Sequence, residues 1–224
     1  MSEPAHGHPH DHDHARTFQP DHDDGGPLPY LQVMEIATRE LLIEKGIITP
    51  DEVRRQIERM DERGRWRGAR VVARAWTDPA FKARLLANGR TGCEEMGITD
   101  LEALHLVVVE NTEKVHNVIV CTLCSCYPKP LMGLPPSWYK SLPYRKRVVR
   151  EPRAVLREFG LELPQDVIVR VHDSTADMRY MVLPRRPEGT EGWSEEALAA
   201  IVTRDCMLGA AVPRATDAGK TGAE

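Results

Sequence analysis

The sequence has few of the features that identify a specialised class of protein. Five cysteines among 224 residues are too few for a disulfide scaffold. The longest apolar stretches, Leu104–Glu110 and Val118–Cys121, fall far short of the ~18 to 20 residues that a membrane span needs. The N-terminal region lacks the apolar core of a secretory signal. We therefore expect a cytoplasmic protein that does not enter a membrane.

An excess of positive charge is also missing. Lys and Arg number 30 and Asp and Glu 34, so the formal net charge is -4. This balance disfavours binding to nucleic acid through phosphate contacts. Hydrophobic residues make up 41% and charged residues 29% of the chain, which is the composition of a globular protein long enough to bury a core.

Both ends of the chain are expected to lie outside that core. Residues 1–26 contain six of the nine histidines, interleaved with Asp, Gly and Pro, and no core can be built from them. We therefore expect a disordered His-rich tail. His-rich tracts bind divalent metals weakly, so a metal-collecting role and no role both stay open. At the other end, residues 213–224 are expected to form a flexible tail.

Residues 27–103 have the pattern of a helical arm. Apolar residues recur at spacings of three and four from Tyr30 to Gly46, and Thr49, Pro50 and Glu52 have the spacing of an N-cap with its first helical turn. Two more helices are expected at about Gly68–Trp76 and Pro79–Asn88. Because this region has little apolar surface of its own, we expect it to pack on a partner subunit.

Residues 104–212 are expected to form an α+β catalytic domain. Strands are predicted in two pairs, each pair joined by a turn, and a last helix should extend from the cap Ser194 towards Met207. Pairs of strands with helices before and after them are typical of an α+β fold rather than a doubly wound sheet. The predicted strands are Leu106–Val109, Val115–Val120, Val167–Val171 and Arg179–Leu183.

Three of the five cysteines lie within six residues, directly after the second predicted strand. The thiols of Cys121, Cys124 and Cys126 can converge on one soft metal ion, because thiolates select zinc, copper(I), iron or cobalt over magnesium and calcium. A structural zinc site normally brings a second CxxC or HxxxH pair, which the chain lacks. A catalytic metal site, a structural zinc or iron–sulfur site and unmetallated buried thiols all remain open from the spacing.

The Cys124-Ser125-Cys126 run adds a further possibility. Two thiolates separated by one residue keep the intervening backbone against the metal, so the amide nitrogens of Ser125 and Cys126 can also bind. An amide nitrogen binds only after it loses its proton. The run therefore favours a strongly Lewis-acidic, trivalent ion over zinc(II).

The run from Val120 to Pro128 resembles the metal-binding motif of the nitrile hydratase α subunit. The similarity continues through the segments 133–140, 144–147, 150–153, 179–184, 186–193 and 202–205, and it includes Val71–Trp76 upstream. The related γ subunit of thiocyanate hydrolase shares the cysteine motif. The resemblance implies a helical arm followed by a layered α-β-β-α domain that carries a metal-claw loop.

The resemblance also implies a non-corrin Co(III) or Fe(III) ion. Cys121 would be the axial thiolate, Cys124 and Cys126 the equatorial sulfurs, and Ser125 and Cys126 the amide ligands. The family oxidises its second and third cysteines, so Cys124 is expected as cysteine sulfinic acid and Cys126 as cysteine sulfenic acid, and these two as the catalytic residues. Thr122 and Tyr127 follow the cobalt pattern, which makes Fe(III) the less favoured ion.

Several partners are implied by the same resemblance. They are a β subunit in an αβ heterodimer or an α2β2 assembly, a small nitrile as substrate, and an activator or metallochaperone that inserts cobalt. Two arginines of the β subunit bind the cysteine oxygens in the family, so the α chain alone should be inactive. The basic stretch from Arg145 to Arg157 is interpreted as a solvated helix face with ion pairs to a partner.

Three other functions compete with this interpretation. Lys129 stands where many nitrile hydratases have tryptophan and thiocyanate hydrolase has a basic residue, which makes a thiocyanate hydrolase γ subunit the alternative. The His-rich tail is compatible with a metal chaperone or sensor. A purely structural subunit would not need the intact cysteine motif.

Overall fold

The computed structural model describes residues 30–62, 64–101, 105–124 and 126–215. The predicted tail at 1–26 lies outside these ranges, as does most of the tail at 213–224. Within the described ranges the chain forms eleven helices and four strands, which are α1 Tyr30–Glu44, α2 Pro50–Glu62, α3 Trp66–Thr77, α4 Pro79–Ala87, α5 Gly89–Glu95, β1 His105–Glu110, β2 Val115–Val120, α6 Lys129–Met132, α7 Ser137–Lys140, α8 Leu142–Arg147, α9 Pro152–Glu158, β3 Ile168–Asp173, β4 Met178–Leu183, α10 Glu195–Ala200 and α11 Arg204–Leu208.

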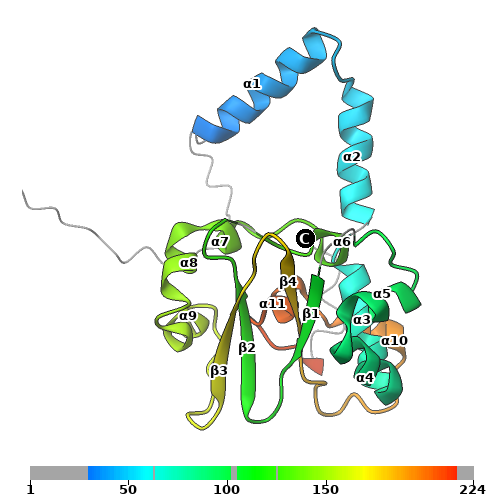
Figure 1. The fold of residues 1–224 in the computed structure, drawn as a ribbon, viewed down its shortest axis with the longest axis vertical. Coiled ribbons are helices and arrows are strands. Elements are labelled where there is room, and N and C mark those ends of the chain that lie inside the picture. Colours follow the sequence, from blue (N-terminus) through cyan, green and yellow to red (C-terminus); the bar gives the residue numbers. More distant parts are fainter. Residues whose placement is uncertain (1–29, 63, 102–104, 125, 216–224) are drawn as a thin grey trace, which may run out of the picture.

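The strands lie between two groups of helices. Figure 1 shows α7, α8 and α9 on one side of the strands and α3, α4, α5 and α10 on the other, while α1 and α2 extend away from this body. The predicted α+β class and layered α-β-β-α arrangement are therefore confirmed. Apolar residues of α1 such as Leu31 remain exposed, with 79% of that residue's surface accessible. Packing of this arm on a partner subunit stays a prediction.

Strand pairing differs from the sequence pattern. The strands do not pair with their neighbours across the turns; instead β1 pairs with β4 and β2 with β3, both in parallel. Parallel partners need long crossover connections, and the segment from 121 to 167 supplies one between β2 and β3. Because both strands of this pair end at the same edge, their last residues, Val120 and Asp173, lie side by side.

Most helix boundaries follow the predicted caps. The capping box at Thr49 is confirmed, since its backbone N–H donates to the Glu52 carboxylate at 2.8 Å and the Glu52 N–H donates back to the Thr49 hydroxyl at 3.2 Å. Asp78 and Ser194 cap α4 and α10 as expected, each accepting a bond from a backbone N–H three residues further along the chain.

One helix prediction was wrong, and one helix was missed. The helix after Ser194 does not continue to Met207, because a second cap forms where the Cys206 N–H donates to the Thr203 hydroxyl at 3.3 Å. The helix predicted to end at about Asn88 agrees with α4, which ends at Ala87, but α5, which begins at Gly89, was not predicted. A glycine is required there by close packing, since a Cβ atom at Gly89 would lie 2.6 Å from the Leu106 carbonyl oxygen.

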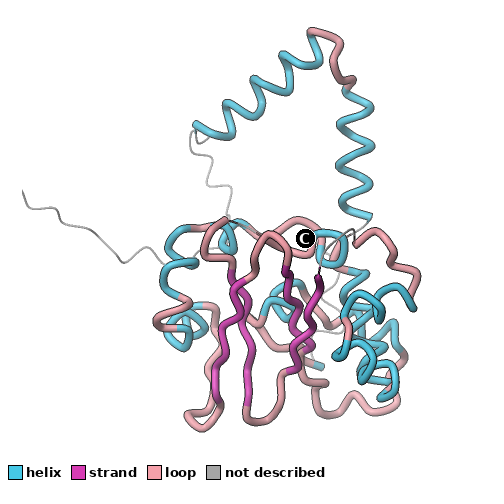
Figure 2. The backbone as a smooth tube through the Cα atoms, viewed as in Figure 1, coloured by secondary structure: helices cyan, strands magenta, loops and turns pink. Residues whose placement is uncertain are grey.

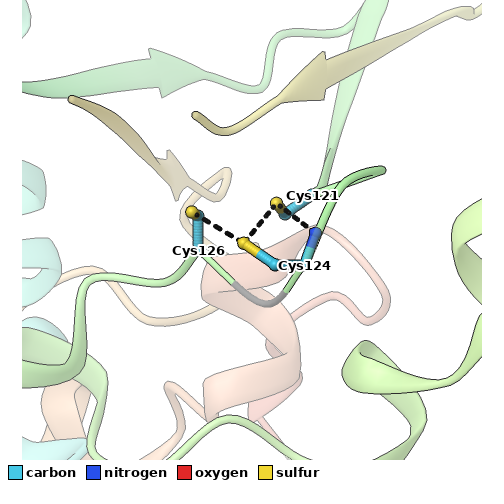
Figure 3. Close-up of side chains that lie close together, drawn as sticks. All are labelled: Cys121, Cys124 and Cys126. Atoms are coloured by element: carbon cyan, nitrogen blue, oxygen red, sulfur yellow. Dashed lines mark hydrogen bonds between the residues drawn. The ribbon is translucent and has the colours of Figure 1, made fainter. Parts of the chain in front are cut away.

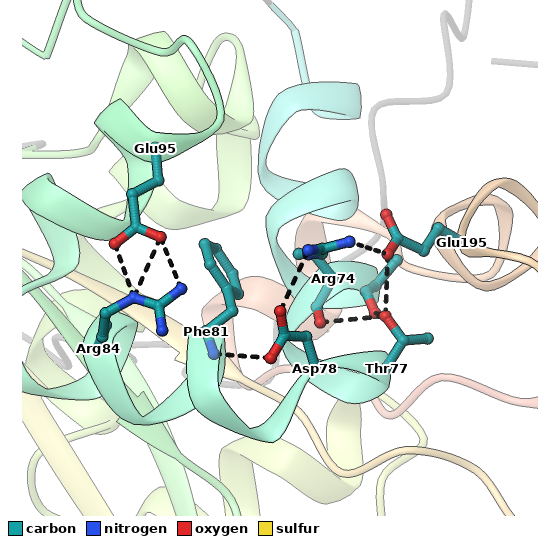
Figure 4. A network of polar contacts seen from close by, with 8 residues as sticks. Arg74, Thr77, Asp78, Phe81, Arg84, Glu95 and Glu195 are labelled. Atoms are coloured by element: carbon teal, nitrogen blue, oxygen red, sulfur yellow. Dashed lines mark hydrogen bonds and ion pairs between the residues drawn. The ribbon is translucent and has the colours of Figure 1, made fainter.

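The helices α3, α4 and α5 belong to the same hydrophobic core as the strands. Buried residues from Ala69 to Cys93 pack in one cluster with residues of β1, β2, β4 and α11. Polar contacts reinforce this packing, as Figure 4 shows: Arg74 bridges Asp78 at 3.1 Å and Glu195 of α10 at 3.0 Å. Of the helices predicted in the arm, only α1 and α2 therefore stand away from the core, and the division at residue 103 stays a prediction.

The edge where β2 and β3 end is covered by loops and short helices. Figure 2 shows loop segments running over this edge, and α6 and α7 are short helices in the proline-rich stretch that follows the cysteines. Among the described helices, none has the length and apolar character needed to cross a membrane.

Candidate metal centre

The claw loop, residues 121–126, begins where β2 ends. Residue 125 lies outside the described structure, so the predicted amide ligand Ser125 cannot be placed. The other three predicted ligands come together: the Cys121 and Cys124 sulfurs are 3.5 Å apart, the Cys124 and Cys126 sulfurs 3.2 Å apart, and all three lie within 4.8 Å of one another (Figure 3). Three sulfurs at this spacing match the donor set of a thiophilic metal ion.

The three cysteines differ in exposure. Cys121 is fully buried at the end of β2, Cys126 is half-buried and Cys124 is exposed. The Cys124 backbone N–H donates to the Cys121 sulfur at 3.3 Å, which turns the chain back over the strand end. A metal ion at this position would therefore be anchored from below by Cys121 and reached from outside past Cys124.

The start of the claw loop is bonded to the end of β3. The Asp173 carboxylate accepts hydrogen bonds from the Thr122 backbone N–H at 2.9 Å and from the Thr122 hydroxyl at 2.5 Å. One residue further, the Ser174 N–H donates to the Val120 carbonyl oxygen at 2.7 Å. The β2–β3 pair thus continues into the loop through side-chain and backbone bonds.

The end of the claw loop is bonded to the segments that follow it. The Tyr139 hydroxyl donates to the Cys126 carbonyl oxygen at 2.9 Å, and the Arg145 guanidinium donates to the Cys124 carbonyl oxygen at 3.0 Å. Tyr139 is fully buried and makes edge-on ring contacts with Tyr127 and Trp138, at centroid distances of 5.4 and 6.0 Å. An aromatic layer therefore supports the loop on the side opposite to solvent.

The electrostatics of the loop disfavour three bare thiolates. Burial, followed by hydrogen bonds with the Cys124 and Cys121 thiols, raises the pKa of Cys126 to about 12, and the positive charge of Arg179 opposes this rise. This rise favours the protonated form of the Cys126 thiol, and a negative charge on the neighbouring Cys121 sulfur acts in the same direction. A multivalent metal ion reverses this preference and deprotonates the sulfurs that coordinate it.

Unpaired donors surround the same loop. In the described part of the chain, the buried side-chain nitrogen and oxygen atoms without a hydrogen-bond partner are Arg145 Nε, Ser174 Oγ and Arg179 Nε. Each belongs to a residue already linked to the claw loop or its neighbours: Arg145 and Ser174 by hydrogen bonds and Arg179 through its effect on Cys126. Buried polar groups are normally paired, so these atoms fit a centre whose bound state supplies further acceptors. The residues present therefore fit a metal ion with anionic ligands.

The remaining cysteines lie elsewhere. Cys93 is buried in α5 and Cys206 in α11, and burial raises the pKa of the Cys93 thiol to about 12. Neither joins the sulfur cluster. Cys206 belongs to the hydrophobic core and packs there as a small buried hydrophobe.

The sequence analysis missed the residues that support the loop. No contact with the claw loop was predicted for Asp173 or Tyr139, and Arg145 was interpreted only as part of a solvated basic face with ion pairs to a partner, whereas it reaches the Cys124 carbonyl oxygen. A signal for Asp173 existed in principle, because it ends a strand as Val120 does. That signal becomes useful only once the parallel pairing of β2 with β3 is known, because this pairing places Asp173 beside Val120.

Comparisons with known proteins give one consistent result. A family model described as "Nitrile hydratase, alpha chain" matches residues 30–211. The cobalt-containing nitrile hydratase subunit alpha of Pseudonocardia thermophila is 54% identical over 175 residues, which cover 77% of this chain and 86% of that protein. Thiocyanate hydrolase subunit gamma of Thiobacillus thioparus is 44% identical over 194 residues, covering 82% and 80% respectively.

Similarity extends to solved structures. A double mutant of an Fe-type nitrile hydratase from Comamonas testosteroni Ni1 has a TM-score of 0.75 and 45% identity, covering 84% of this chain and 92% of that chain. The family match spans every helix and strand from α1 to α11, so the claw loop and the elements that support it fall within the shared region.

Proposed function

The chain belongs to the nitrile hydratase alpha-chain family, and from this premise we propose that it is the α subunit of a cobalt-dependent nitrile hydratase, which adds water to a small nitrile to give the corresponding amide. The observation that carries the proposal is the convergence of the Cys121, Cys124 and Cys126 sulfurs within 4.8 Å. The names of similar proteins, which include cobalt-containing nitrile hydratase α subunits, favour cobalt over iron.

We assign the donors as the family resemblance implies. Cys121, Cys124 and Cys126 would hold the ion through their sulfurs, and the backbone nitrogens of Ser125 and Cys126 would complete the protein's ligand set. The burial of Cys121 and the short distances between the sulfurs support this assignment. Trivalent cobalt bound there would supply the Lewis acidity that activates a nitrile or water towards carbon–oxygen bond formation.

The chain's own groups orient the reaction and move its protons. Cys126, as sulfenate, would accept a proton from the water whose oxygen adds to the nitrile carbon and pass it to the nitrile nitrogen, and the imidic acid so formed would rearrange to the amide by a further proton transfer. The sulfinate expected on Cys124 would adjust the donor strength of its sulfur. Tyr139 and Arg145 keep the two cysteine carbonyls in place. The Nε atoms of Arg145 and Arg179 are buried and have no hydrogen-bond partner in the described part of the chain.

A β subunit completes the enzyme in this proposal. Leu123, at the tip of the claw loop, is 84% exposed, and Tyr30 on α1 is 74% exposed. Large apolar side chains exposed at a candidate active centre and along a projecting helix are typical of surfaces that a partner covers. We propose an αβ heterodimer or α2β2 assembly, loaded with cobalt by an activator or metallochaperone and located in the cytoplasm.

Thiocyanate hydrolysis is the second candidate, favoured by Lys129. This exposed residue begins α6, three residues after Cys126. An enzyme for the thiocyanate anion would benefit from fixed positive charge near its metal, whereas a neutral nitrile needs none.

The test uses the chain produced together with its β subunit in medium that contains both cobalt and iron. We expect about one cobalt per α chain by elemental analysis, and amide from an aliphatic or aromatic nitrile with negligible carbonyl sulfide from thiocyanate. Full activity with iron alone would refute the metal assignment. A kcat/KM that favours thiocyanate would move the chain to the second candidate.

A further inference from the structure

Asp173 occupies a special position next to the candidate metal centre. It is the last residue of β3, and both oxygens of its carboxylate accept hydrogen bonds from one residue of the claw loop, Thr122. From this geometry we infer that Asp173 is a positioning residue: it determines the path of the loop between Cys121 and Cys124, and through that path how firmly the sulfurs retain a metal ion. The inference rests on the proposed function, because it assumes that the claw loop binds a metal.

The strand register explains why this aspartate can reach the loop. Val120 and Asp173 are paired residues at the ends of parallel strands, and the Ser174 N–H extends the pairing by one bond to the Val120 carbonyl oxygen at 2.7 Å. The chain beyond Val120 has no further strand partner. The Asp173 side chain takes over at that point and bonds the N–H and the hydroxyl of the second residue of the loop.

Burial cannot anchor this part of the loop. Thr122 and Cys124 are exposed, and Leu123 between them is 84% exposed. Cys121 is fully buried, so the loop leaves the core at one residue and must bring Cys124 back to within 3.5 Å of the Cys121 sulfur. Without the bonds to Asp173, the Thr122 N–H and hydroxyl would bond to water, and the segment 122–124 could adopt other turn conformations. Metal binding would then have to order this segment, and the lost conformational entropy would weaken retention of the metal.

A carboxylate suits this task better than an amide. An ionised carboxylate only accepts hydrogen bonds, and its two oxygens can each receive one donor from Thr122. In Asp173→Asn the remaining oxygen can still accept from the Thr122 N–H, but the other becomes an NH2 group that can only donate, so its bond with the Thr122 hydroxyl is reversed and the negative charge is lost. The substitution keeps the size of the side chain and replaces two charge-assisted hydrogen bonds with weaker neutral ones.

The experiment compares metal retention in the assembled αβ complex. Wild type, Asp173→Asn and the control Asp166→Asn are loaded with cobalt, and cobalt content is followed over time in the presence of a chelator together with the sulfur-to-cobalt charge-transfer spectrum. Asp166 is also exposed and lies next to β3, but at the other end, where it pairs with Lys114 at 2.6 Å. We expect Asp173→Asn to lose cobalt about three- to tenfold faster, which is the effect of a partly exposed charge-assisted hydrogen bond, with an altered spectrum. Asp166→Asn should match wild type.

A second variant tests the other partner of the contact. Thr122→Val removes the hydroxyl and keeps the N–H, so it should speed cobalt loss, but less than Asp173→Asn does. Thr122→Ser keeps the hydroxyl donor and should retain cobalt as the wild type does. Combined with Asp173→Asn, the Thr122→Val effect should be less than additive. If Asp173→Asn does not assemble, the Thr122 pair decides the question.

Wild-type retention and spectrum in Asp173→Asn, or in Thr122→Val, would overturn the inference. Equal loss of cobalt in Asp173→Asn and Asp166→Asn would also overturn it, because the effect would then not depend on the claw loop. A wild-type complex that binds cobalt and hydrates no nitrile would refute the proposed activity instead, and the role of Asp173 in retention could still be measured.

Discussion

Replacing Tyr139 with phenylalanine removes a single hydroxyl beneath the claw loop. That hydroxyl donates to the Cys126 carbonyl oxygen at 2.9 Å from a fully buried ring. The ring contacts with Tyr127, Trp138 and Tyr144 do not involve the hydroxyl, so Tyr139→Phe should leave the aromatic layer packed and create almost no cavity. The change therefore removes the hydrogen bond to the backbone of a proposed metal ligand while the ring packing stays in place.

The magnitude follows from the burial of this bond. A buried carbonyl that loses its donor costs about 1 to 3 kcal/mol, which in a chain of this size lowers an apparent Tm by about 2 to 12 °C. If a tenth to a half of that free energy is also lost in positioning Cys126 for reaction, kcat falls by up to about tenfold. KM should change less, because the hydroxyl is buried below the loop and not on its exposed side.

Tyr127→Phe is the matched control. Tyr127 is buried in the same aromatic layer, but its hydroxyl donates to the Met132 carbonyl oxygen at 3.3 Å and not to the claw loop. Both variants should lose stability, whereas only Tyr139→Phe should change kcat and the absorption of the metal centre in the purified αβ complex. Identical kcat and spectra in the two variants would show that the bond to Cys126 has no part in positioning the centre.

Three further outcomes are expected. Cys126→Ala should abolish nitrile hydration. Cys206→Ala should lower the free energy of unfolding by only about 1 to 2 kcal/mol and keep most of the activity. A folded, metal-loaded Cys206→Ala enzyme without activity would contradict the interpretation of that thiol as a core residue. Deletion of residues 1–24 should leave turnover unchanged at full cobalt occupancy and reduce loading only when cobalt is scarce, so a large loss of turnover in the fully loaded enzyme would contradict it. Burial lowers the pKa of His116, so below about pH 6.5 the folded state binds fewer protons than the unfolded state. The urea concentration at the unfolding midpoint should therefore fall as the pH drops from 7.5 to 5.5. His116→Gln should reduce that fall.

The surroundings of His116 give the structural basis of this pH dependence. Its Nε2 donates to the Gly209 carbonyl oxygen at 2.7 Å, since a carbonyl can only accept, and its Nδ1 accepts from the Asn111 side-chain amide at 3.2 Å. A second proton on the ring would place an N–H against the NH2 of Asn111. The neutral form is therefore the one that this buried site accommodates.

Local signals in the sequence were sufficient for most helix ends. Thr49, Asp78 and Ser194 act as N-caps as predicted, because a cap is a contact between residues three apart and depends little on the rest of the fold. The break between α10 and α11 and the start of α5 at Gly89 were missed. In the second case the deciding contact is to the Leu106 carbonyl oxygen, which the local sequence cannot reveal.

The sequence by itself determined the chemistry of this protein. Three thiols within six residues can form a site for a thiophilic metal wherever the rest of the chain lies, because their spacing is short enough for the loop alone to bring the sulfurs together. The motif around them also carried the resemblance to one family, which the match over residues 30–211 bears out.

Only the tertiary structure decided what surrounds those thiols. Asp173 reaches Thr122 because β2 and β3 pair in parallel and end at the same edge, with a crossover of more than forty residues between them. Tyr139 and Arg145 reach the carbonyls of Cys126 and Cys124 because the crossover folds back under the loop. Such contacts depend on strand order and register, and these are set by the packing of the whole core rather than by any local pattern.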